Sequence, residues 1–138
     1  MNIYRQFQSD LLTAIAPLLP EGSDLSRVTV EPPRDDSHGD LATNAAMVLA
    51  KAAGSNPRAL AEKLTPVIQG LPHVTSVEIA GPGFLNVRVD PQLWHNVMAD
   101  IFKEGVAYGA SDIGAHKKVN IEYVSANPTG PLHVGHGR

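Results

Sequence analysis

Apolar residues near the start of the chain recur at the spacing of one helical face. The stripe consists of Ile3, Phe7, Leu11, Ile15, Leu18 and Leu19. This spacing predicts a helix over residues 3–19, which Pro20 and Gly22 close. Pro17 can end the regular helix one turn earlier, because proline has no N–H to donate.

A short strand and two further helices are predicted next. Residues 28–30 indicate a strand, which the proline pair that follows ends, because proline cannot donate to a sheet ladder. Asp40 is placed to cap a helix over residues 41–53. An Asn-Pro pair, an N-cap followed by proline, begins another helix over about residues 57–69.

A β-hairpin is predicted beyond these helices. Residues 74–80 and 84–89 indicate two strands around the turn Gly81-Pro82-Gly83. Side chains of a strand alternate between its two faces. On the second strand, one face carries Phe84, Asn86 and Arg88, and the other carries Leu85, Val87 and Val89.

An amphipathic helix follows the hairpin, and then the pattern weakens. Asp90-Pro91 begins a helix whose apolar stripe around Trp94 is expected to join the core. Residues 107–117 show little hydrophobic pattern and read as a linker. Residues 118–124 predict a single strand, and a helix starts at about Leu132.

These elements predict an α+β unit over residues 1–106, in which helices pack with a small antiparallel sheet. Residues 118–138 hold one strand, a loop and a helix start, which bury too little apolar surface to fold alone. They are typical of the start of a Rossmann-like, nucleotide-binding α/β domain. We therefore expect a fragment that is cut inside its second domain.

The amino-acid composition excludes several classes of protein and of functional site. Eleven Lys and Arg against fourteen Asp and Glu give a net charge of -3, which argues against a basic module that binds nucleic acid mainly through phosphates. The chain has no cysteine, which excludes disulfides, thiolate metal sites and a cysteine nucleophile. Neither a signal peptide nor an apolar membrane span is visible, so we expect a cytoplasmic protein.

Polar groups gather where the last predicted strand ends. Glu122, Ser125 and Asn127 supply a carboxylate, a hydroxyl and an amide there. Open α/β sheets bind ligands at that end of their strands. The region is therefore a candidate site for a cationic or amine-bearing ligand.

The loop and helix start that follow have features of a phosphate site. Gly130 and Gly135 permit close approach to the backbone, and a helix N-terminus attracts anions. His133 and His136 can donate hydrogen bonds to phosphate oxygens. No third ligand accompanies this pair, so we predict no metal site there.

The segment Pro131-Leu132-His133-Val134-Gly135-His136 resembles the His-Ile-Gly-His signature of class I aminoacyl-tRNA synthetases, with valine in the isoleucine position. The run from Glu122 to Pro131 resembles the arginyl-tRNA synthetase family in particular. Residues 38–44 and 81–86 are similar to segments of that family's N-terminal domain. The three blocks stand in the right order, so the resemblance spans most of the chain.

The resemblance implies an arginine site. Glu122 would contact the guanidinium of arginine, which suits a bidentate, charge-assisted pair. Ser125 and Asn127 would orient the α-amino group of the amino acid.

The resemblance also implies an ATP site. Gly130, Gly135 and the two histidines, His133 and His136, would bind ATP, with Mg²⁺ accompanying the nucleotide. The histidines would be the catalytic pair, since they would stabilise charge as the arginine carboxylate attacks the α-phosphorus. An arginyl-adenylate would form first, and arginyl-tRNA would follow.

In this family the N-terminal domain recognises the outer corner of tRNA(Arg), near the D-loop. The resemblance implies that Phe84 stacks on an unpaired base while Asn86 bonds the edge of that base. The alternatives are a core aromatic at Phe84 and a solvated amide at Asn86.

The full-length protein would then be a monomeric arginine–tRNA ligase, and this fragment alone would be inactive. Two other functions stay open. One is a freestanding RNA-binding module, and the other is a class I synthetase for another amino acid.

Overall fold

The computed structural model describes residues 2–122, 130, 131 and 133. The chain divides into two compact units, Met1–Val106 and Ala107–Arg138. The first unit holds a sheet and its helices, and the described residues of the second form turns and irregular segments beyond the short 3₁₀ turn Gly105–Ala107.

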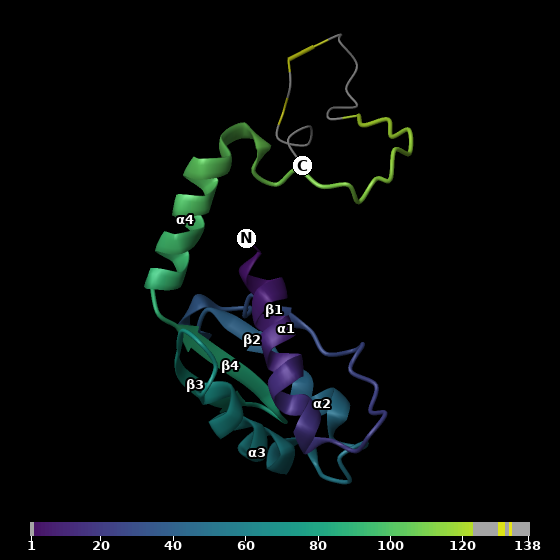
Figure 1. Cartoon of the computed structure of the whole chain (residues 1–138), viewed down its shortest axis with the longest axis vertical. Coiled ribbons are helices and arrows are strands. Elements are labelled where there is room, and N and C mark those ends of the chain that lie inside the picture. Colours follow the sequence, from purple (N-terminus) through teal and green to yellow (C-terminus); the bar gives the residue numbers. More distant parts are fainter. Residues whose placement is uncertain (1, 123–129, 132, 134–138) are drawn as a thin grey trace. The chain divides into compact units, whose positions relative to one another are not determined.

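The first unit is built on a four-stranded antiparallel sheet (Figure 1). Its strands are β1 (Val30–Glu31), β2 (Leu41–Thr43), β3 (Val74–Ala80) and β4 (Phe84–Val89). The order across the sheet is β1-β2-β4-β3, so β2 and β4 are the inner strands. Sequential strands β3 and β4 form a hairpin, whereas β2 reaches β4 from a distant part of the chain.

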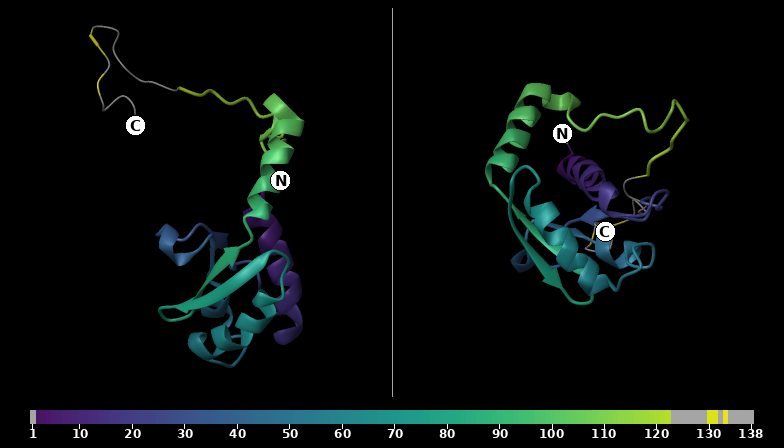
Figure 2. Two further views of the ribbon diagram at one scale, coloured as in Figure 1. Left: turned by 90° about the vertical axis from the view of Figure 1, so that its left-hand side faces the viewer. Right: turned by 60° about the horizontal axis from the view of Figure 1, so that its bottom comes forward.

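Three helices cover one face of this sheet (Figures 1 and 2). They are α1 (Ile3–Ile15), α2 (Ala45–Leu49) and α3 (Pro57–Gln69). A fourth helix, α4 (Gln92–Glu104), follows the hairpin. Short 3₁₀ turns η1 (Ala16–Leu18) and η2 (Asp36–His38) lie in the connecting segments. No helix in the described part of the chain is long and apolar enough to cross a membrane.

The core lies between the helices and the sheet. The buried apolar residues of α1, α3 and β4 belong to one core cluster. The largest fully buried ones are Leu11, Ile15, Leu41, Leu49, Leu64, Ile68 and Leu85. Burying one such side chain stabilises a fold by about 1.5–3 kcal/mol, so this layer is the main source of stability.

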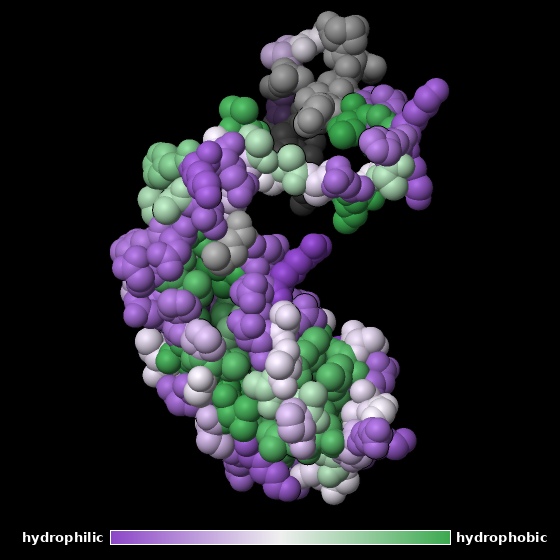
Figure 3. Space-filling model, in the orientation of Figure 1, coloured by the Kyte–Doolittle hydropathy of each residue, from purple (hydrophilic) through white to green (hydrophobic). Residues whose placement is uncertain are grey.

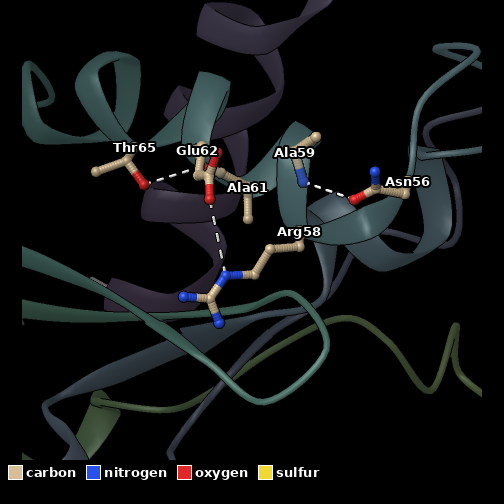
Figure 4. Close-up of polar contacts among 6 residues, drawn as sticks. All are labelled: Asn56, Arg58, Ala59, Ala61, Glu62 and Thr65. Atoms are coloured by element: carbon tan, nitrogen blue, oxygen red, sulfur yellow. Dashed lines mark hydrogen bonds and ion pairs between the residues drawn. The ribbon is translucent and has the colours of Figure 1, made fainter.

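Helix α3 begins as the Asn-Pro pair predicts. The Asn56 side-chain oxygen accepts a hydrogen bond from the Ala59 N–H at 2.8 Å, which satisfies one of the free donors of the first turn (Figure 4). On the solvent side, Arg58 and Glu62 form an exposed i,i+4 ion pair at 3.8 Å. Such pairs contribute at most about 0.5 kcal/mol, so the cap and the apolar stripe define this helix.

Several predictions are confirmed. The structure is an α+β unit with a small antiparallel sheet, and the hairpin strands and the third helix have the predicted bounds. The first helix is regular only to Ile15, and a 3₁₀ turn containing Pro17 follows it, one turn early as the proline allows. The first strand forms at Val30–Glu31, slightly later than predicted.

The helix predicted over residues 41–53 is wrong. Residues 41–43 form β2 and only Ala45–Leu49 is α-helical. Leu41 and Thr43 are buried and alternate with a half-buried alanine, which is the pattern of a strand. Pairing with β4 overrides the helical propensity of this alanine-rich segment, because an inner strand satisfies backbone groups on both edges.

Two further expectations need correction. The α4 stripe joins the core only through its first half, since Leu93, Trp94 and Val97 pack against it while Met98 and Phe102 are exposed. Residues 118–122 form no strand, and the remainder of the predicted strand lies outside the described residues. A lone strand has no partner to accept its backbone hydrogen bonds, which explains the difference.

Candidate nucleic-acid interface

The face of the sheet that the helices do not cover carries the candidate RNA-contacting residues. Along β4, Leu85, Val87 and Val89 are buried against the core, so the intervening residues point to the opposite face. The Phe84 side chain is 42% exposed, which rules out the alternative of a core aromatic. An aromatic ring on an uncovered sheet face is available to stack on a planar ligand.

Asn86 lies in the middle of this face. It pairs with Ala42 on β2 and with Glu78 on β3, so its side chain stands between a small residue and a carboxylate. Asn86 is only 8% exposed, because it sits on an inner strand, and this contradicts the alternative of a solvated amide near a turn. No hydrogen bond joins its amide to another described residue. Every fully buried polar side-chain atom of the described chain has a hydrogen-bond partner, so the amide atoms of Asn86 are not fully buried. The amide therefore reaches the surface with its hydrogen-bonding capacity unused.

Asp40 connects the preceding loop to β4. Its N–H donates to the Val87 carbonyl at 2.9 Å, and its carboxylate accepts from the Val89 N–H at 2.9 Å. The predicted role of Asp40 as a helix cap is therefore wrong, because a strand and not a helix follows it. Instead, Asp40 extends the β2–β4 pairing by one residue and secures the strand that carries Asn86.

Gly39 allows the loop to approach β4 this closely. Its φ is +124°, and a Cβ placed there would lie 2.8 Å from the Val87 carbonyl oxygen. Only glycine tolerates both the conformation and the contact. The Arg88 guanidinium, on the exposed face, donates a hydrogen bond to the Ser37 carbonyl oxygen and so ties the middle of η2 to β4.

The turn η2 also has its own cap. Asp35 accepts a hydrogen bond from the Ser37 N–H at 2.9 Å. Hydrogen bonds from the Ser37 side chain and backbone lower the pKa of the Asp35 carboxyl below its usual value. The loop over residues 35–40 is thus ordered against the sheet by several polar contacts.

The hairpin turn is fixed in a similar way. Gly83 has a φ of +147°, and a Cβ there would lie 2.9 Å from the Pro57 side chain. The turn therefore packs directly against the first residue of α3. This contact sets the position of Phe84, which is the next residue along the chain.

Asn44 completes the support at the other end of the face. Its side-chain oxygen accepts from the Thr29 N–H at 2.8 Å, and its amide donates to the Arg27 carbonyl at 3.2 Å. These bonds tie the end of β2 to the segment that leads into β1. The segment 38–44 thus owes its glycine, aspartate and asparagine to the backbone geometry of this sheet.

The predicted arginine and ATP sites fall in the second unit. Glu122, Gly130 and His133 are described and exposed. Ser125, Asn127, Gly135 and His136 lie outside the described residues. Over the described positions, no three His, Asp or Glu side chains come together as a group that could hold a metal ion. The roles assigned to these residues stay predictions.

The model of the arginyl-tRNA synthetase N-terminal domain matches residues 5–89. The chain belongs to the arginyl-tRNA synthetase family. An arginine–tRNA ligase of Parvibaculum lavamentivorans is 57% identical over 143 aligned residues, and one of Agrobacterium fabrum is 53% identical. Each alignment covers the whole of this chain but 24% of the relative, so the chain spans about a quarter of the length of these ligases.

Solved arginyl-tRNA synthetases share the fold. The enzyme of Plasmodium falciparum aligns with a TM-score of 0.60 and 16% identity, over 72% of this chain and 18% of its own. The enzyme of Thermus thermophilus aligns with a TM-score of 0.52 and 23% identity, over 98% of this chain and 21% of its own. At these identities, both likenesses concern the fold alone.

Two residues of the uncovered face were missed by the sequence reasoning. The sequence predicts a helix at Ala42 and therefore does not reveal that this residue lies opposite Asn86. The position of Glu78, by contrast, can be predicted from the sequence. The hairpin turn pairs Ala80 with Phe84, so the residues two positions farther from the turn, Glu78 and Asn86, also pair.

Proposed function

We propose that this chain is the tRNA-recognition part of an arginine–tRNA ligase and the beginning of its catalytic domain. The similarity of the whole chain to arginine–tRNA ligases carries this proposal. The complete enzyme, which acts as a cytoplasmic monomer, activates arginine with ATP and Mg²⁺ and transfers it to tRNA(Arg).

In the first unit, Phe84 and Asn86 receive one unpaired base of the tRNA. Phe84 stacks on the base, and the Asn86 amide, which can donate and accept, bonds its edge. The exposure of Phe84 and the unused amide of Asn86 on one uncovered sheet face support this assignment. Arg88 lies two residues further along the same face, where its guanidinium can meet a phosphate.

In the second unit, Glu122, Ser125 and Asn127 hold arginine, whereas His133 and His136 hold the phosphates of ATP. The carboxylate of Glu122 matches the guanidinium in charge and shape. The two imidazoles stabilise negative charge as the adenylate forms, and Gly130 and Gly135 allow the phosphates to approach the backbone.

A chimaeric enzyme tests both assignments. This chain would replace the corresponding N-terminal quarter of the Parvibaculum lavamentivorans ligase, and charging of tRNA(Arg) with labelled arginine would be measured. Stacking on one base is worth about 1–3 kcal/mol, so Phe84→Ala should lower kcat/KM for tRNA by about 5- to 150-fold. The KM for arginine should not change. Met47→Ala, an exposed apolar residue on the helical side, is the matched control and should charge normally.

The catalytic assignment has a separate readout. In the same chimaera, His133→Ala and His136→Ala should each reduce kcat by at least about tenfold while the KM for tRNA stays near its original value. Normal charging by the double variant would contradict the ATP assignment. A loss of charging in Met47→Ala as well as Phe84→Ala would contradict the RNA assignment.

The 138-residue chain by itself distinguishes the alternative of a freestanding RNA-binding module. We expect it to show no arginine-dependent ATP–pyrophosphate exchange. Tight tRNA binding by the chain, together with unimpaired charging by the Phe84→Ala chimaera, would instead favour the module.

A further inference from the structure

Glu78 lies directly across from Asn86 on the uncovered face of the sheet. The register of β3 and β4 pairs the two residues, and Val77 and Ile79 on either side of Glu78 pack toward the core. Opposed residues of antiparallel strands have Cβ atoms about 4.5–5.5 Å apart. A base that Asn86 contacts at its edge is therefore within reach of the Glu78 carboxylate.

The Glu78 carboxylate has no structural role among the described residues. It is exposed, it stands on the edge strand β3, and neither an ion pair nor a hydrogen bond joins it to another described residue. An ionised carboxylate only accepts hydrogen bonds. Its charge also repels phosphates, so its contribution to RNA binding has to come from a donor group on a base.

The opposite neighbour of Asn86 leaves room for such a base. Ala42 presents only a methyl group, and the next residue in that row is Glu31 on β1. Two strand spacings, about 10 Å, separate Glu31 from Asn86, so its carboxylate is farther from the base than that of Glu78. Asn86 and Glu78 are thus the adjacent polar groups beside the Phe84 ring.

We propose that Glu78 makes this surface selective for a nucleotide whose base carries an exocyclic amino group. The inference rests on the proposed function, in which Phe84 and Asn86 receive an unpaired base. Adenine, cytosine and guanine offer an amino N–H to the carboxylate. Uracil presents carbonyl oxygens on either side of its single N–H, and these oxygens repel the carboxylate.

The experiment compares RNA hairpins that differ in one amino group. Each hairpin has a uridine loop with a single variable nucleotide, either adenosine or purine riboside, which lacks the amino group. Binding to the ¹⁵N-labelled 138-residue chain is followed by amide chemical-shift changes. A hydrogen bond to a charged group at a solvent-accessible site should make the adenosine hairpin bind about three- to tenfold more tightly.

Three variants identify the source of this preference. Glu78→Ala should reduce the preference to about onefold, and Glu78→Gln, which keeps a neutral acceptor, should give an intermediate value. Both variants should bind the purine riboside hairpin at least as tightly as the original chain binds it, because a negative charge near phosphates is removed. Glu31→Gln removes the same charge from the same face and should keep the preference.

The other outcomes would each overturn one part of the proposal, either the role of Glu78 or the RNA surface. A preference that survives in Glu78→Ala, or that falls equally in Glu31→Gln, overturns the role of Glu78 while leaving the RNA surface in place. If Phe84→Ala binds each hairpin as tightly as the original chain does, the RNA surface itself is wrong, and so is the role of Glu78.

Discussion

Replacing Gly39 with alanine tests whether the loop before β2 is held against β4 by close backbone contact. The new Cβ would lie 2.8 Å from the Val87 carbonyl oxygen, a rigid backbone atom, at a φ of +124°. The unfavourable backbone conformation costs about 1–3 kcal/mol, and forcing an atom into a filled space costs about 1–3 kcal/mol more. We therefore expect Gly39→Ala to lower the free energy of unfolding by about 2–6 kcal/mol.

Urea unfolding, followed by the fluorescence of the single tryptophan and by circular dichroism, measures this loss. Trp94 is a suitable probe because it packs against the core of the first unit. Gly81→Ala is the matched control, since its φ is +52° but nothing lies within 4 Å of the added Cβ. Left-handed backbone alone costs about 1–2 kcal/mol, so the control should lose less stability. Equal losses in the two variants would show that the contact between Gly39 and Val87 does not constrain the loop.

Three further predictions concern the same unit. Asn44→Ala removes hydrogen bonds of 2.8 and 3.2 Å to backbone groups and should cost about 1–3 kcal/mol in urea unfolding. Phe102→Ser should change the stability of the isolated chain by less than about 0.5 kcal/mol, because this side chain is 81% exposed; a larger loss would mean that the second half of α4 packs in solution. Hydrogen bonds from Ser37 lower the pKa of Asp35, so the order of this turn should be complete above the unfolded value of about 3.9 and be lost as the pH falls through the lowered pKa. Carboxyl NMR titration of Asp35 measures this, and a titration at or above the unfolded value would contradict the cap.

Elements with strong local signals were predictable from the sequence. Helix α3 has a side-chain cap, a proline at its first position and a full apolar stripe, and its predicted bounds match. The hairpin has a Gly-Pro-Gly turn between two alternating strands, and it also matches. In each case the local propensity, the turn chemistry and the burial pattern favour the same structure.

Strand β2 was not predictable in the same way. Its three residues precede an alanine-rich segment with high helical propensity, and only the tertiary pairing with β4 favours a strand. Because that pairing joins segments more than forty residues apart, no local pattern reveals it. The predicted helix cap at Asp40 is wrong for the same reason, because a strand follows this residue.

The uncovered face can be predicted from the sequence only in part. Strand alternation alone places Phe84 and Asn86 on one side of β4, and the chain order of the hairpin adds Glu78. The sequence does not reveal which side of β4 the helices cover, nor that Asn86 is nearly buried, because both depend on the long-range arrangement of α1, α2 and α3. Figure 3 shows apolar side chains gathered over the side where α1 and α2 lie. The burial of Leu85, Val87 and Val89 against the core leaves Phe84, Asn86 and Arg88 on the opposite face of β4.

The negative net charge of the chain is consistent with this kind of recognition. A protein that binds RNA mainly through phosphates needs a basic surface, which a net charge of -3 does not favour. In the proposed site an aromatic ring, a neutral amide and one carboxylate would instead contact the base itself, and such contacts carry specificity more than affinity. In a complete synthetase the remainder of the enzyme can supply the affinity for the tRNA backbone. The first unit can then be weakly attractive to RNA in general and still select the correct base.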